Sequence, residues 1–338
     1  MKLASVSRSA ALLVALITLT VVAIAETTIP TPKLEWSGYV QGRFTDVIGK
    51  MQAPPTPADT NFDVKRAYLN LRATVGDHFG ATILVTGQPK TMVVEAFVDY
   101  IDNPYQARLG LSRITYGYET GLSSTKLITL ERSKAISDLV YTPFLYDRGA
   151  FVYYKPAVGF NLALAIVNGN PPDVSTDPNE AKNLDGRFGY RSKGFDIGVS
   201  AYTGKLAYNT KGEKLDIPLS ADRFGFDVEY INGPIVLLSE LIYGEDSQLD
   251  GPTIKRQGGY VTVGYRLPKS KFMPYLRYDW YDRDLDNNIS ADDFSRVTMG
   301  VNCYVNTFTR LTLEYEAIND EVEFEQDGRL TAQAQVNF

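Results

Sequence analysis

The chain has 338 residues, with 34 basic and 40 acidic side chains, and its formal net charge at pH 7 is −6. A hydrophobic content of 44% excludes an intrinsically disordered chain, and 27 glycines are too few for collagen. The only cysteine, Cys303, excludes an intramolecular disulfide and a thiolate metal cage, and the only histidine, His78, excludes a histidine-rich metal site.

The first 25 residues differ in character from the rest. Lys2 and Arg8 precede an apolar run over 10–22, and small residues at Ala23 and Ala25 follow it. This order is typical of a secretory signal peptide, so residues 1–25 are predicted to be cleaved and residues 26–338 to form the exported protein. A retained anchor helix is the alternative, but the run is shorter than the roughly 20 residues that a bilayer requires.

From residue 34 onward the chain alternates apolar and polar side chains. Trp36, Val40 and Phe44 alternate with Gln41 and Arg43, a period of two that indicates a strand. The same alternation recurs in 66–75, 196–202, 296–304, 310–317 and 329–338. About sixteen segments follow, starting near residues 34, 62, 79, 93, 105, 149, 159, 184, 195, 221, 234, 256, 272, 294, 308 and 329.

The connections between these segments alternate in length. The short ones include 76–78, 103–104, 192–194 and 232–233, and the long ones include 45–61, 115–148, 168–183, 204–220 and 283–293. One rim of short turns and one of long loops is typical of an outer-membrane barrel with extracellular loops. A sheet can cross hydrocarbon only without an edge, because every backbone polar group must be paired there. A secreted β-sandwich is the alternative, although its strands are usually five or six residues long.

The polar face of the predicted barrel is strongly charged. Strand parity places five candidate pore-lining residues on it: Arg43, Arg66, Arg72, Arg108 and Arg277. Acidic residues such as Asp99 and Glu314 share that face. Because burying an unpaired ion costs several kcal/mol, and a barrel of about sixteen strands is wide enough for a channel, the lumen is predicted to hold water.

Several short stretches resemble a known family. They are RLGL at 108–111, YE at 118–119, LITLERS at 127–133, VKRAYL at 64–69, NG at 168–169, RYD at 277–279 and the terminal Phe338. Together they resemble the phosphate-selective porin O and P family of Gram-negative outer membranes. The chain departs from the family pattern at 110–113, where it reads GLSR instead of GQFK.

The resemblance implies a homotrimer of 16-stranded barrels in the outer membrane, each with a long third loop folded into the pore. That loop would be 115–148, and its region contains five candidate basic groups for the constriction and for solute binding: Arg113, Lys126, Arg132, Lys134 and Arg148. Phe338 would be the residue read by the barrel-assembly machinery. Because acidic residues in the same loop nearly cancel this charge, both a phosphate-preferring channel and a general porin for small hydrophilic solutes remain open.

Residues 282–293 contain a calcium-loop pattern. Asp282, Asp284, Asp286, Asn288 and Asp293 occupy ligand-like positions of a twelve-residue window. Asn287 replaces the usual glycine, and Asp293 replaces the usual final glutamate. A Ca²⁺ ion in an extracellular loop is therefore one interpretation, and a solvated acidic loop without a cofactor is the other.

The function predicted from the sequence is a passive outer-membrane porin in contact with lipid and small hydrophilic solutes or anions, and not with nucleic acid. An enzyme is not expected, because the outer-membrane phospholipases and proteases use a histidine as general base and His78 falls in a predicted short turn on the opposite rim. The alternative is a structural or adhesive barrel that acts through its extracellular loops.

Overall fold

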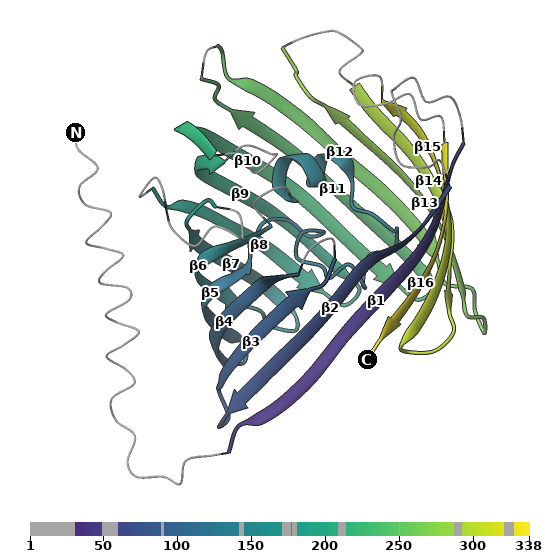
Figure 1. Ribbon diagram of the computed structural model, residues 1–338, viewed down its shortest axis with the longest axis horizontal. Helices are drawn as coiled ribbons and strands as arrows, with labels where there is room; N and C mark the ends of the chain where they lie inside the picture. Colours follow the sequence, from purple (N-terminus) through teal and green to yellow (C-terminus); the bar gives the residue numbers. More distant parts are fainter. Residues whose placement is uncertain are drawn as a thin grey trace.

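The computed structural model describes residues 31–48, 60–88, 91–141, 145–170, 177, 181–208, 214–249, 251–286, 293–320 and 328–338. Within these ranges, sixteen antiparallel strands form one closed barrel, as predicted (Figure 1). The predicted signal peptide, residues 1–25, lies outside the described residues.

The strands follow one another around the barrel in sequence order. Their bounds are β1 Lys33–Ile48, β2 Thr60–Val75, β3 Phe79–Thr86, β4 Met92–Asp102, β5 Tyr105–Arg113, β6 Tyr146–Tyr154, β7 Gly159–Val167, β8 Asn183–Ser192, β9 Phe195–Tyr208, β10 Lys214–Asn232, β11 Ile235–Asp246, β12 Ile254–Tyr265, β13 Phe272–Asp282, β14 Asp293–Tyr304, β15 Thr309–Asp320 and β16 Gly328–Asn337. Between β5 and β6 lie a short helix, α2 (Lys134–Ile136), and a π-helical turn, η1 (Ser137–Tyr141). No helix in the described part of the chain is both long and apolar enough to cross a bilayer.

The barrel closes where the first strand meets the last. Val40 of β1 lies opposite Val336 of β16, and the pairing continues from Tyr39 to Ile48. Beyond the end of β16, Gly38 donates its N–H to the Phe338 carbonyl (2.8 Å), and Phe338 donates to the Gly38 carbonyl (3.0 Å). The sheet therefore has no free edge at this seam, which is the requirement for spanning hydrocarbon.

The two rims differ as the alternation of loop lengths predicts. The turn rim carries the connections 76–78, 103–104, 155–158, 193–194, 233–234, 266–271 and 305–308, together with the start of β1 and the carboxyl terminus. The loop rim carries the longer ones, among them 114–145 and 168–182. One predicted loop, 204–220, is shorter than expected, because β9 and β10 extend and leave only 209–213 between them.

The two faces of the sheet also differ. Large apolar side chains are exposed on the outer face, for example Trp36 (64%), Leu109 (61%) and Phe224 (57%). Neighbours on the same strands, such as Gln41 and Asp227, are polar and buried. An apolar exterior around a polar interior, in one closed sheet, excludes the β-sandwich, which packs two apolar sheet faces together.

Glycines on the inner face make room for arginines that lie flat against the wall. A Cβ atom on Gly198 would lie 2.5 Å from Cζ of Arg187. Arg187 donates hydrogen bonds to Asp227 (2.9 Å) and Asp196 (2.8 Å) on the neighbouring strands. The side chain therefore links three strands without filling the lumen.

Candidate functional site

Residues 114–141 and 145, called the inner segment below, are held against the inner wall of the barrel. Four wall carboxylates accept hydrogen bonds from its backbone N–H groups: Asp185 from Thr115 (2.6 Å), Glu240 from Tyr118 (3.0 Å) and Glu119 (3.1 Å), Glu314 from Leu130 (3.0 Å), and Asp279 from Lys134 (3.3 Å). A segment without regular structure leaves many backbone groups unpaired, and buried ones need partners. The charged wall supplies them.

Wall side chains also bind the carbonyl groups of the inner segment. The donors are Arg310 to Leu127 (2.6 Å), Asn302 to Ile128 (2.9 Å), Arg296 to Arg132 (3.0 Å) and Arg223 to Leu139 (2.9 Å). Carboxylates of β8–β15 thus bind the N–H groups of the inner segment, and arginines and one asparagine of β10–β15 bind its carbonyls. The charge on this part of the wall positions the inner segment.

Two glutamates of the inner segment form ion pairs with the wall. Glu119 pairs with Arg277 (2.9 Å). Glu131 binds Arg43 (2.6 Å) and Arg66 (2.8 Å), and Lys65 lies 3.5 Å away. Although burial opposes ionisation, these three cations hold the pKa of the Glu131 carboxyl well below its usual range.

Apolar side chains fill the remaining contact between the inner segment and β9–β14. Ile114, Tyr116, Ala135, Ile136, Leu139 and Val140 pack against wall residues that include Tyr202, Leu206, Ile242, Tyr260 and Phe294. Many charged residues of this wall are buried and ion-paired, among them Asp279, Arg296 and Glu316. The prediction that the charged inner face is wet is therefore wrong for this side, because the inner segment covers it.

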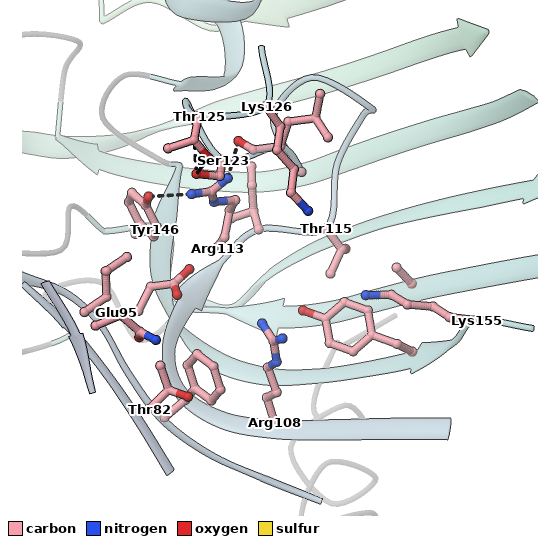
Figure 2. Close-up of a pocket in the computed structure, with 18 of the residues that line it drawn as sticks. Thr82, Glu95, Arg108, Arg113, Thr115, Ser123, Thr125, Lys126, Tyr146 and Lys155 are labelled. Carbon is pink, nitrogen blue, oxygen red and sulfur yellow. Dashed lines mark hydrogen bonds between the residues drawn. The ribbon is translucent and has the colours of Figure 1, made fainter. Parts of the chain in front are cut away.

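An open cavity of about 780 Å³ remains on the other side, between the inner segment and β1–β9. Seven basic side chains line it: Arg72, Arg108, Arg113, Lys126, Lys155, Arg187 and Arg191. Glu95 and Asp196 are its acidic lining residues. Figure 2 shows Arg108 and Lys155 pointing into this space from the wall and Lys126 pointing into it from the inner segment.

The structure separates the five predicted constriction residues. Arg113 and Lys126 line the cavity, and Arg113 donates to the hydroxyl of Tyr146 (2.7 Å) (Figure 2). Arg132 does not line the cavity, contrary to the prediction. It is only 5% exposed and donates to the carbonyls of Glu119 (3.3 Å) and Leu122 (2.5 Å). Arg132 therefore folds the inner segment on itself.

The other two predicted constriction residues also lie outside the lining. Lys134 lies at the start of α2, where it pairs with Asp138 (3.3 Å) and faces the ring of Phe294 (6.0 Å). Arg148 lies on β6, beyond the end of the inner segment, and its carbonyl accepts a hydrogen bond from the backbone of Asn168 (3.1 Å). Spacing in the sequence brought these residues near the loop but did not reveal which way they point.

The predicted pore-lining arginines divide in the same way. Arg72 and Arg108 line the cavity, and Arg72 also pairs with Asp99 (3.1 Å). Arg43 and Arg66 instead bind Glu131. Arg277 is 1% exposed beneath the inner segment, so the prediction that it lines the pore is wrong. Strand parity identified the inner face correctly but not the part that the inner segment covers.

The sequence interpretation missed several cavity residues. Lys155 was overlooked because it follows β6 in a turn rather than within a strand. The aromatic lining was also missed: Tyr39, Tyr68, Phe97, Tyr118, Tyr146 and Tyr153. Strand parity was the signal available for the tyrosines on β1 and β2, which fall on the same face as the arginines.

The predicted calcium loop is only partly described. Asn288 lies outside the described residues. The Asp282 carboxylate accepts the N–H of Asp284 (3.0 Å), and Asp286 lies 3.2 Å from the ammonium of Lys255. Within the described ranges, no group of three acidic, histidine or cysteine residues is arranged to hold a metal ion. Calcium binding stays a prediction.

No protein-family model matches the chain, and no curated protein matches it by sequence. Solved structures do match. The trimer form of OmpT, an outer membrane protein of Vibrio cholerae, is 14% identical with a TM-score of 0.67, over 91% of this chain and 100% of that chain. The anion-selective porin from Comamonas acidovorans is 13% identical with a TM-score of 0.65, over 91% and 100%. The outer membrane channel DcaP of Acinetobacter baumannii is 13% identical with a TM-score of 0.64, over 93% and 100%. The chain therefore has the fold of bacterial outer-membrane porins.

Proposed function

We propose that the protein is a passive porin of the bacterial outer membrane, a water-filled channel for small hydrophilic solutes with a preference for anions. The turn rim faces the periplasm, and the loop rim faces the medium. The chain reaches the membrane by way of the signal peptide predicted at residues 1–25. Transport of this kind requires no catalytic group and no cofactor.

The observation that carries this proposal is the cavity between the inner segment and β1–β9. Seven basic side chains and two acidic ones line it. Some of these cations are neutralised by the wall, as Arg187 is by Asp196 and Asp227. The excess of positive charge remains, and rings of arginine and lysine are how anion pores select. The mature chain is acidic, but its buried carboxylates bind the inner segment rather than the solute.

The surroundings of the barrel support the same proposal. The exposed apolar residues of the outer face fit a lipid environment. The trimer form of the similar OmpT structure, together with the resemblance to the phosphate-selective porins, favours a homotrimer, and the terminal Phe338 would engage the barrel-assembly machinery. Phosphate is the first inorganic anion to test, because a planar arginine fork donates two parallel hydrogen bonds to it.

Planar-bilayer recordings of the purified protein test the proposal. We expect discrete, stable conductance steps and, in a KCl gradient, a reversal potential that favours chloride. Arg108→Gln should shift the reversal potential toward cations, whereas Arg266→Gln, an equal loss of charge at an exposed position on the turn rim, should not. Inserted protein without conductance steps would contradict the channel and favour a structural or adhesive barrel.

A further inference from the structure

Three cations converge in the cavity, whose acidic lining residues are Glu95 and Asp196. Arg108 comes from β5, Lys126 from the inner segment and Lys155 from the turn after β6 (Figure 2). Among the described residues, none of the three forms an ion pair with an acidic side chain. Because like charges that face one open space repel each other, the arrangement is stabilised by an anion placed among them.

Aromatic rings hold two of these cations in place. The guanidinium of Arg108 lies 4.4 Å from the ring centre of Phe97 and 5.2 Å from that of Tyr153. The ammonium of Lys155 lies 3.8 Å from the ring centre of Tyr153. Cation–π contacts of this kind fix a cation without neutralising its charge. Both side chains therefore keep their charge available to a solute.

The same cavity also has an aromatic side. Tyr39 and Tyr68 stack with ring centres 5.0 Å apart and planes 11° apart, and both line the cavity. Each is only half-buried, so ring surface faces the open space. Leu84, Leu122 and Leu162 add apolar surface to the lining. A hydrated inorganic ion makes no use of such a surface.

The volume fits an organic solute. At about 780 Å³, the cavity falls within the range of roughly 300 to 1,000 Å³ that is typical of sites for small organic ligands. Such sites combine an apolar or aromatic wall with a few polar groups that fix the orientation of the ligand. Cations on one side and stacked rings on another match a flat molecule with one anionic end.

We propose that the cavity is a binding site for small aromatic carboxylates, with the carboxylate among Arg108, Lys126 and Lys155 and the ring against the tyrosine-rich wall. This inference rests on the proposed channel function and names the class of solute that the channel carries. It differs from a site for inorganic anions, because the ring contributes to binding as well as the charge.

The protonation of Lys155 supports this site. Water reaches the side chain, but partial burial and the nearby positive charges of Arg108 and Arg191 lower the pKa of Lys155 to about 8. Below that pH the ammonium is charged and attracts a carboxylate, and above it the charge is lost. A carboxylate should therefore bind more tightly at pH 6.5 than at pH 9.5.

The test compares three probes that block single-channel current in planar bilayers: benzoate, acetate and benzyl alcohol. Benzoate combines charge and ring, acetate has the charge alone, and benzyl alcohol has the ring alone. We expect the concentration for half block to be about tenfold lower for benzoate than for acetate, because ring stacking and apolar burial add to the charge. Benzyl alcohol should not block.

Matched variants separate the two parts of the site. Arg108→Gln should raise the half-block concentration of benzoate on the order of tenfold, since a hydrogen bond to a charged group is lost, and Arg266→Gln should leave it unchanged. Tyr68→Leu should raise the benzoate value several-fold and leave the acetate value unaltered. Tyr265→Leu, on the outer face of β12, is the control for the tyrosine change.

The outcomes distinguish this inference from the proposed function. Equal half-block concentrations for benzoate and acetate would overturn the aromatic site while the channel stands. Tighter block by inorganic phosphate than by benzoate would also overturn it, in favour of an inorganic-anion site. An inserted protein that gives no conductance steps would overturn the channel proposal itself, and the inference would fall with it.

Discussion

Through Glu131, the inner segment binds an ion cluster on β1 and β2, and Glu131→Gln tests what that contact does. The carboxylate binds Arg43 at 2.6 Å and Arg66 at 2.8 Å, with Lys65 at 3.5 Å. The glutamine amide keeps one acceptor oxygen but places N–H donors beside these cations. We expect the edge of the inner segment to leave this wall.

The size of the effect follows from the contacts. Hydrogen bonds to charged groups contribute about 1.5–3 kcal/mol each, and two direct bonds are weakened. Because the Glu131 side chain is 25% exposed, water reduces the loss to about 3 kcal/mol in total. That loss changes the ratio of docked to released segment by roughly two orders of magnitude.

Single-channel recording measures the release. The variant should show larger conductance steps and greater current noise, because a passage opens between the inner segment and β1–β2. It should also select anions more strongly, since one negative charge has been removed from the lumen. Glu35→Gln removes an exposed carboxylate from β1 without touching the inner segment and should behave like the wild type. Wild-type conductance and noise in Glu131→Gln would refute the reasoning.

The same contact predicts resistance to mild acid. The folded-state pKa of Glu131 lies below its ordinary value of 4.5, so its stabilisation is fully present above 4.5 and is lost only as pH falls through the lower, folded-state pKa. Conductance attributable to this contact should therefore be unchanged between pH 7 and pH 4.5. If lowering the pH from 7 to 4.5 raised the conductance of the wild type but not that of Glu131→Gln, this assignment would be contradicted.

Three further predictions concern the turn, the seam and the acidic loop. Because the pKa of Lys155 is lowered to about 8, raising the pH from 7 to 9.5 should reduce the anion preference in reversal-potential measurements, and Lys155→Met should remove that dependence. Gly38→Val should impair barrel closure, because the added Cβ would lie 2.5 Å from the Tyr68 carbonyl and 2.7 Å from the Phe338 ring. Heat-modifiable gel mobility measures the closure. Gly42→Val is the control, since no atom lies within 4 Å of the Cβ added there. If residues 282–293 bind calcium, Ca²⁺ should raise the melting temperature and Asp284→Asn should abolish the increase, and a titration without any change would contradict the calcium interpretation.

The strands were predictable because their cause is local. Alternation of apolar and polar side chains is visible in the sequence wherever one face of a strand is the apolar exterior of the barrel, as at Trp36 and Val40. Strand starts predicted at 79, 105, 159, 195 and 272 match those of β3, β5, β7, β9 and β13. The lengthening of β10 to residue 214 was missed, although Leu215, Ile217 and Leu219 alternate with the residues between them, because Pro218 argued against a strand there.

The candidate site was only partly predictable because its cause is not local. Parity shows that Arg277 and Arg108 point to the same side of the sheet, but one is covered and the other is open. The difference depends on where the inner segment lies, and that depends on wall groups more than 100 residues away along the chain, such as Glu240 and Glu314. The basic residues of the loop region, Arg132 above all, could not be divided into lining and internal groups without that placement.

The central claim is that water lies inside the barrel and lipid outside it, and adjacent residues of one strand test it most directly. Asn70 lines the cavity, and its neighbour Leu69 is exposed on the outer face of β2. In a Cys303→Ser background, Asn70→Cys in bilayers should react with a membrane-impermeant thiosulfonate and lose conductance, whereas Leu69→Cys should not react. The reverse pattern, or equal reaction at both positions, would contradict the account.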